Sequence, residues 1–346
     1  MKMSLKRKKL LSCLSLVPSS HPSPGTLNSN SITMERLYKS VRQEHVDQAS
    51  KTKNAPMKQY KLYIVALVAL YTFSSCEKVI DVNLPDGEKL PYLDAWITNK
   101  PGKQTIKFLR AVNYLENKAP EVVTGAQIVV TDVTDNKTYN FTFQNGAYEY
   151  DAGAAAIGII GHTYKLNITW DGQQFEATDK LTRVTKVDSI SVEYRDEEKT
   201  SGDEKVGYYA EMHARDLIGG TDYTWIRTYK NGSLNYHVNE MVAIDASFYE
   251  DASDGYVFIE PFREGITSDG EPYEKGDVVK VVLRSLSKPT YDFLDQLIDQ
   301  LYSGGLFAKV LQNVPSNIFN KQADSKKKIY GWFGTVAESE LSKTIN

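Results

Sequence analysis

Short stretches in which hydrophobic and polar residues alternate recur between residues 92 and 286. Because the side chains of a strand point alternately to two faces, stretches such as Ala126–Val130 predict strands with one buried face. Dipeptides typical of tight hairpin turns separate many of these stretches: Asn145-Gly146, Asp171-Gly172, Asn231-Gly232, Asp254-Gly255 and Asp269-Gly270. Strands do not alternate with helices, so the pattern predicts a mainly β protein of the sandwich class.

The predicted strands fall into two groups, which we interpret as two β-sandwich-like domains with a boundary near residues 182–188. The N-terminal β-sandwich, residues 76–182, contains Tyr92–Ile97, Gln104–Arg110, Ala126–Asp132, Lys137–Phe143, Ala147–Tyr150, Thr163–Trp170 and Gln173–Lys180. The C-terminal β-rich domain, residues 183–346, contains Ser189–Tyr194, Gly207–Ala214, Tyr223–Lys230, Ser233–Val238, Tyr256–Ile259 and Asp277–Leu286. The charged segment at residues 195–205 is expected to be a solvated loop.

One segment of the second domain has helical periodicity instead. Its apolar residues recur three or four positions apart: Tyr291, Leu294, Leu297, Ile298 and Leu301. Ser287 can cap this segment, Pro289 suits its first turn, and Gly304 or Gly305 would end it. The spacing predicts an amphipathic helix near residues 288–303, whose apolar stripe packs on a sheet.

An uncharged apolar segment at residues 62–73 precedes all of these elements. It is shorter than the roughly 20 residues that a helix needs to cross a bilayer, and it follows Lys58 and Lys61, as in a secretory signal. Ser74 and Ser75 then lead into Cys76. This arrangement resembles a bacterial lipoprotein signal peptide at residues 57–75, although Phe73 stands where leucine is usual. The resemblance implies that Cys76 is lipidated, for example with palmitate, and becomes the mature N-terminus. The alternatives are a single membrane anchor and a buried core segment.

Charge divides the chain at the same place. The net charge is −3, but residues 1–75 carry 12 Lys and Arg against 3 Asp and Glu, which leaves 29 against 41 for residues 76–346. A body this acidic is a poor partner for nucleic acid. We interpret residues 1–56 as an over-long gene start or a disordered leader, the alternative being a nucleic-acid-binding arm.

Few residues suggest catalysis or metal binding. Cys13 and Cys76 are the only cysteines, which excludes a disulfide framework and a cysteinyl zinc site in the body. The sequence contains no HExxH, P-loop, GxGxxG or GxSxG motif. We therefore assign no catalytic, metal-binding or cofactor-binding residue and expect no cofactor. Paired carboxylates of a glycosidase remain open, because their separation depends on the fold.

Several polar and aromatic residues have two interpretations each. The body has three histidines, His162, His213 and His237; the last two fall in predicted strands, and we interpret those two as structural. The acidic groups at Asp132, Asp135 and Asn136 and at Asp251 and Asp254 suggest calcium superficially, but they lack EF-hand spacing, and Asx turns account for them. Four tryptophans could stack on sugars or fill a protein interface, although core packing explains most such residues: Trp96, Trp170, Trp225 and Trp332.

Several short motifs follow one another in a specific order across residues 76–346. They are Cys76–Val82, Leu93–Asn99, Val123–Ala126, Gly276–Ser287, Asn313–Ile318 and Tyr330–Gly334. In this order they resemble the Bacteroidetes lipoproteins of domain-of-unknown-function family 4249. The portion at residues 123–177 is also similar to transthyretin-like or carboxypeptidase-regulatory-like sandwiches, so the first domain is expected to be Ig-like or transthyretin-like. Tyr249–Pro261 departs from the family pattern.

The resemblance implies an outer-membrane lipoprotein, of a kind often encoded beside TonB-dependent receptors, without known catalytic residues. We therefore expect a lipid-anchored accessory or binding protein of a TonB-dependent uptake system, held to the membrane through Cys76, that binds a carbohydrate or peptide and no nucleic acid. The alternatives are a carbohydrate-active enzyme with dispersed carboxylates and a structural surface or adhesion lipoprotein. The sequence does not decide which side of the outer membrane the body occupies.

Overall fold

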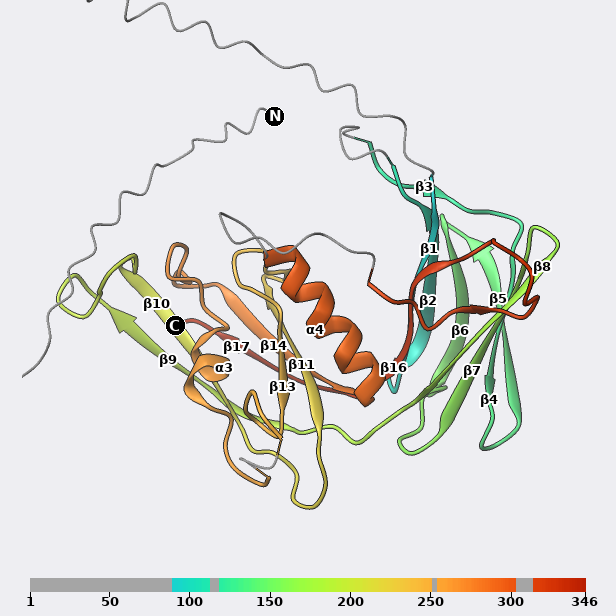
Figure 1. Cartoon of the computed structure of the whole chain (residues 1–346). Helices are drawn as coiled ribbons and strands as arrows, with labels where there is room; N and C mark the ends of the chain where they lie inside the picture. The colour runs from blue at the N-terminus through green and yellow to red at the C-terminus, as the bar shows by residue number, and fades with distance from the viewer. Residues whose placement is uncertain (1–88, 113–117, 251–253, 303–313) are drawn as a thin grey trace, which may run out of the picture. The chain divides into compact units, whose positions relative to one another are not determined.

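The computed structural model describes residues 89–112, 118–250, 254–302 and 314–346, which belong to the compact unit Asn83–Asn346 (Figure 1). The first strands are β1 (Pro91–Thr98), β2 (Pro101–Arg110), β3 (Glu121–Val122), β4 (Gln127–Asp132), β5 (Lys137–Gln144), β6 (Ala147–Ala156), β7 (Thr163–Trp170) and β8 (Gln173–Lys180). The elements that follow are β9 (Val187–Arg195), β10 (Gly207–Ala214), β11 (Tyr223–Lys230), β12 (Ser233–Leu234), β13 (Met241–Ile244), α3 (Glu260–Glu264), β14 (Val278–Leu286), α4 (Lys288–Tyr302), β15 (Phe319–Asn320), β16 (Tyr330–Val336) and β17 (Glu338–Thr344). The predicted mainly β fold is confirmed.

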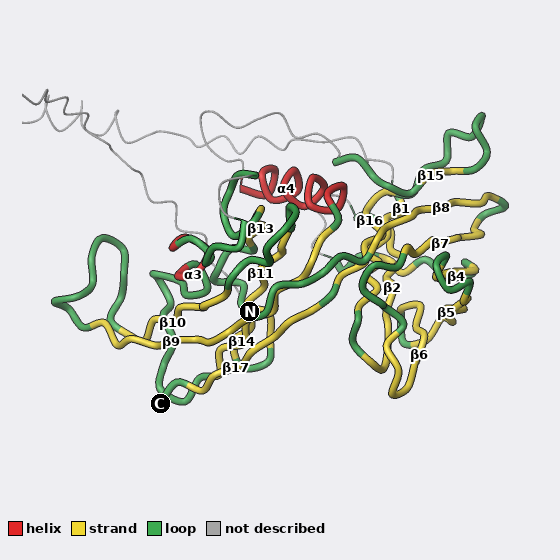
Figure 2. The backbone as a smooth tube through the Cα atoms, turned by 90° about the horizontal axis from the view of Figure 1, so that it is seen from below, coloured by secondary structure: helices red, strands yellow, loops and turns green. Residues whose placement is uncertain are grey.

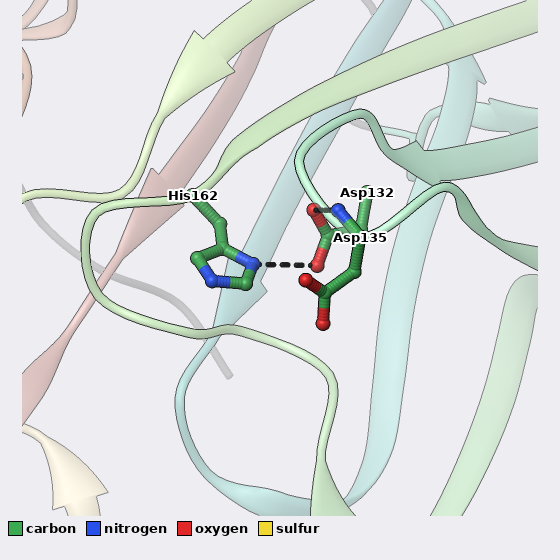
Figure 3. Close-up of side chains that lie close together, drawn as sticks. All are labelled: Asp132, Asp135 and His162. Atoms are coloured by element: carbon green, nitrogen blue, oxygen red, sulfur yellow. Dashed lines mark hydrogen bonds and ion pairs between the residues drawn. The ribbon is translucent and has the colours of Figure 1, made fainter.

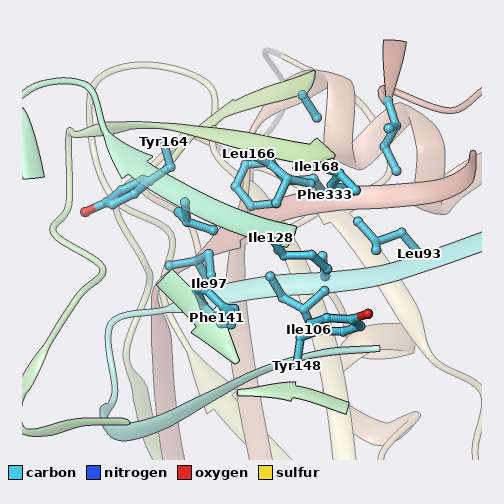
Figure 4. Packing of buried hydrophobic residues seen from close by; sticks show 14 of the residues in the cluster. Leu93, Ile97, Ile106, Ile128, Phe141, Tyr148, Tyr164, Leu166, Ile168 and Phe333 are labelled. Carbon is cyan, nitrogen blue, oxygen red and sulfur yellow. The ribbon is translucent and has the colours of Figure 1, made fainter. Parts of the chain in front are cut away.

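One sheet contains the first eight strands together with β15 and β16. Its order is β15-β8-β7-β4-β5-β6-β2-β1-β16, with β3 paired to β2. All neighbours are antiparallel except β1 and β16, which run parallel. The sheet curls over a single core, in which Leu93, Ile128 and Phe333 from different strands meet (Figure 4). Residues near the C-terminus thus complete the sheet that begins the described chain.

The remaining strands form a second sandwich-like arrangement. A five-stranded sheet, β12-β11-β14-β17 with β13 on β11, shares a core with the two-stranded sheet β9–β10 and with α3. On the opposite side, α4 lies over β11 and β13 (Figure 2). Strand β11 is therefore covered on both faces: Ile226 points into the core with β10, and Trp225 points towards α4. The cluster that packs α4 on β11 also includes side chains of β1 and β16, so α4 lies beside the first sheet as well.

The buried carboxylate of Asp179 joins two strands of the first sheet, β8 and β16, to the start of α4. It lies at the end of β8 and is 7 % exposed. Its oxygens accept hydrogen bonds from the Ser287 hydroxyl at 2.5 Å, the Thr290 hydroxyl at 3.3 Å, and the amide and hydroxyl of Thr335 at 2.7 and 3.1 Å. Ser287 also caps α4, as predicted, by accepting the Thr290 amide. One side chain therefore fixes the start of α4 against β8 and β16.

The hairpin predictions hold where both turn residues take positive φ. Asn145-Gly146, Asp171-Gly172 and Asn231-Gly232 do so, with φ between 50° and 83°, and they connect β5 to β6, β7 to β8 and β11 to β12. Strand β12 is shorter than the predicted Ser233–Val238. The predicted strand Tyr256–Ile259 is wrong: only Val257 forms an isolated bridge, with Arg215, and α3 starts directly afterwards.

Candidate binding site

A cavity of about 1130 Å³ opens where β1, β11, β16 and α4 meet. We call it the aromatic cavity, because aromatic side chains from all four elements line it: Tyr92, Trp96, Trp225, Phe293, Tyr330 and Trp332. Tyr236, from the loop after β12, lines it as well. Cavities of several hundred Å³ that are largely apolar and carry a few polar groups are typical ligand sites.

Three of the four tryptophans meet in this cavity. Trp96 and Trp225 contact each other with ring centroids 5.2 Å apart, and Phe293 of α4 stacks on Trp332 at 4.4 Å. The Trp332 indole N–H donates to the Thr290 hydroxyl at 3.0 Å. The fourth, Trp170, lies elsewhere, against Phe108. Trp225 and Trp332 are buried, as the interpretation of core packing predicts, and both also line the cavity.

Glycines of β16 allow β1 to approach closely enough to build this wall. Gly334 lies opposite Trp96 in the parallel pair, and a Cβ there would collide with the indole ring. Gly331 has φ of 87°, and a Cβ on it would collide with the carbonyl oxygen of Leu93. Both positions thus need glycine, one for space and one for space and backbone conformation.

Charged groups hold the tryptophans in place. Arg227 and Arg284 lie against Trp225, with guanidinium carbons 4.6 and 5.2 Å from the ring centroid. Glu240 accepts the Trp225 indole N–H at 2.9 Å and pairs with Arg227 at 2.9 Å. Asp94 likewise accepts the Trp96 indole N–H at 2.8 Å. The two carboxylates of the cavity wall therefore orient indole rings, and this fixed polar frame surrounds an apolar interior.

The rim of the aromatic cavity exposes large apolar side chains. Tyr236 is 84 % exposed and Leu301, in the last turn of α4, is 71 % exposed. The predicted helical stripe therefore divides: Leu294 is buried against the sheet, Leu297 and Ile298 are half-buried in the cavity wall, and Leu301 faces solvent. The prediction that the whole stripe packs on a sheet is wrong for Leu301, which lies outside the packed cluster that contains Leu294, Leu297 and Ile298. The predicted helix end at Gly304 or Gly305 lies outside the described residues.

A second cluster joins Asp132, Asp135 and His162 (Figure 3). Asp132 is fully buried; one carboxylate oxygen accepts the amides of Thr134 and Asp135, and the other contacts His162 Nδ1 at 2.8 Å. Burial alone would raise the pKa of Asp132, but these hydrogen bonds together lower it below its ordinary value. Both oxygens of Asp132 therefore have partners, and the turn is an Asx turn, as the sequence predicts.

The other residues considered from the sequence lie apart from the aromatic cavity. His213 lies in β10 and hydrogen bonds Ser191 at 2.8 Å, whereas His237 lies in a loop, not in a strand, and pairs with Glu271 at 3.1 Å. Asp254 accepts the Gly219 amide. Cys76, Cys13, Asp251 and the segments at residues 1–56 and 57–75 lie outside the described residues. Within the described ranges, neither helix has the length and apolar character that crossing a membrane requires.

Comparison with known proteins gives one family. The sequence model of the family described as "Domain of unknown function (DUF4249)" matches residues 77–342. That range includes every element of the two sheets except the last residues of β17. No curated protein matches the chain.

Proposed function

Because the chain belongs to the DUF4249 family, whose description states no activity, we propose from the structure that it is a binding protein whose aromatic cavity holds the ligand. The cavity carries this proposal: it is about 1130 Å³ in volume, aromatic on its walls and open at a rim with exposed apolar side chains. A fixed polar frame around aromatic faces suits a ligand that has both apolar faces and hydrogen-bonding groups. Oligosaccharides and short peptides both fit this description.

We further propose that the protein acts at the outer membrane of a Bacteroidetes bacterium, as an accessory subunit of a TonB-dependent uptake receptor. Two features support this: the apolar segment and Cys76 resemble a lipoprotein signal, and the motifs resemble lipoproteins often encoded beside such receptors. Two or more acyl chains at Cys76 would anchor the protein stably without a spanning helix. In this role the cavity would present a nutrient, or receive a segment of the receptor.

The acyl anchor can be tested by replacing its attachment residue. In the native host, Cys76→Ala is expected to abolish incorporation of labelled palmitate and to shift the protein from the membrane fraction to the soluble fraction, because the thiol that receives the lipid is gone. Ser75→Ala, which keeps a small residue in front of Cys76, is the matched control and should leave both properties unchanged. Palmitate labelling that persists in Cys76→Ala would contradict the proposal, and receptor co-purification from the same membranes tests the partner separately.

Ligand binding can be tested at the rim, where substitutions spare the core. Tyr236→Ala is expected to weaken binding about five- to tenfold, since exposed aromatic rims contribute about 1 kcal/mol to binding. Binding is followed by the fluorescence of the cavity tryptophans during titration with defined glucan oligosaccharides and, separately, tripeptides to hexapeptides. Tyr249→Ala, at a tyrosine that is 75 % exposed and does not line the cavity, is the matched control. Equal effects of the two variants would place binding elsewhere.

A further inference from the structure

Three buried aspartates meet at a place separate from the aromatic cavity. Asp216 follows β10, Asp222 precedes β11 and Asp245 follows β13; they are 3 %, 7 % and 2 % exposed. One carboxylate oxygen from each lies within 4.8 Å of the other two. Carboxylates repel one another when they are this close and shielded from water, so the arrangement requires a compensating group.

Arg183 compensates one of the three. Its guanidinium donates to both oxygens of Asp222, at 2.8 and 2.6 Å. The remaining N–H groups donate to backbone carbonyls of the loop between Asp216 and Asp222, those of Leu217, Ile218 and Gly220. Arg183 therefore holds this loop to the connection between β8 and β9.

Among the residues that the structure describes, one carboxylate oxygen of Asp216 has no hydrogen-bond partner. Its Oδ2 accepts the Gly255 amide at 3.2 Å, whereas its Oδ1 is buried without a hydrogen-bond partner. Asp245 is constrained differently, because its Oδ1 accepts the Asp222 amide at 2.6 Å. A buried acceptor without a partner is costly, and it is a common sign of a missing water or ion. Three carboxylates and one guanidinium leave a net charge of two negative units.

We propose that Asp216, Asp222 and Asp245 form a binding site for a divalent cation, and that the cation is Ca²⁺. A divalent ion would neutralise the cluster and occupy the partnerless side of Asp216. All the donors are oxygens, without a histidine or cysteine, which favours calcium over zinc or copper. Three carboxylates supply part of the six to eight oxygens that calcium takes, and the flexible geometry of calcium tolerates such irregular shells better than magnesium does.

The site could not be predicted from the sequence, because its members are 6 and 23 residues apart and form no EF-hand pattern.

The cluster around Asp132 provides an internal comparison. It contains two carboxylates and a histidine within the same mutual distance, but both oxygens of Asp132 already accept hydrogen bonds. The difference between the two clusters is the partnerless Asp216 oxygen, so a variant at the Asp132 cluster is the matched control.

The test measures the thermal stability of the purified full chain in EDTA and then with CaCl₂ or MgCl₂ added. Calcium at about 100 times its dissociation constant is expected to raise Tm by roughly 5 °C or more, and magnesium by less. Asp216→Asn removes one charge and should abolish most of the calcium response. In EDTA this variant should be at least as stable as the native chain, because the repulsion among three carboxylates is reduced. Asp135→Asn should keep the full response.

Each result decides the proposal. No rise in Tm with calcium would overturn it, as would an undiminished rise in Asp216→Asn or a rise with magnesium that exceeds that with calcium. If Asp216→Asn does not fold, isothermal titration of the native chain with CaCl₂ decides, since one site per chain supports the proposal and no saturable binding overturns it. Failure here would leave ligand binding in the aromatic cavity untouched, because the two sites share no residue.

Discussion

Replacing Asp179 with alanine is expected to lower the free energy of unfolding by about 4 kcal/mol, because hydrogen bonds to charged groups contribute about 1.5–3 kcal/mol each and are partly coupled. The change leaves the Thr335 amide and the hydroxyls of Ser287 and Thr290 without their acceptor in a buried position. Denaturant unfolding followed by tryptophan fluorescence measures the loss. For a domain of this size we expect Tm to fall by roughly 10 °C.

The variant Asp179→Asn tests how much of this stability comes from the hydrogen bonds of Asp179 and how much from its negative charge. Asparagine keeps one acceptor and the shape, and hydroxyl groups can rotate to accept from its amide, so we expect a loss of about 1–2 kcal/mol. A loss as large as that of Asp179→Ala would show that the negative charge itself is required. A loss near zero in Asp179→Ala would contradict the role of Asp179 as the joint between β8, α4 and β16.

The native chain and Asp179→Asn are also expected to differ in how their stability depends on pH. Burial raises the pKa of Asp179 above its ordinary value, although the surrounding hydrogen bonds oppose the shift. Between its ordinary pKa and its raised pKa, the folded state therefore holds a proton that the unfolded state has released. This contribution to stability is fully present below the unfolded pKa and is lost as pH rises through the folded pKa. The stability difference between Asp179→Asn and the native chain should follow that window.

The local pattern of polar and apolar residues was sufficient to predict those strands that have one buried face and end at a hairpin turn. Strands β7 and β8 were predicted to the residue, because polar and apolar positions alternate on both sides of Asp171-Gly172. Strand β16 was not predicted as a strand, although its residues were noted as a motif. Its side chains from Trp332 to Val336 are buried on both faces and interrupted by glycine, so no alternation exists.

The aromatic cavity could not be predicted for a different reason. Trp96 and Trp332 share it only because β16 pairs in parallel with β1 across more than 230 residues of chain, and hydrophobic patterns carry no information about such pairing. The glycines at positions 331 and 334 were the available signal. In a strand, glycine marks a close approach of another backbone or ring, and both positions here face β1 or its tryptophan.

That signal can be tested directly by Gly331→Ala, for which we expect a loss of about 4 kcal/mol: about half from the positive φ and the rest from the clash with Leu93. Gly276→Ala is the matched control, since Gly276 also has positive φ, 94°, but open space where a Cβ would stand. It should lose only about 1–2 kcal/mol. The difference between the two variants, measured by denaturant unfolding, isolates the contact between β1 and β16. If both variants lost the same amount, the two strands would be able to separate without cost, and the tryptophan wall of the cavity would not depend on their close approach.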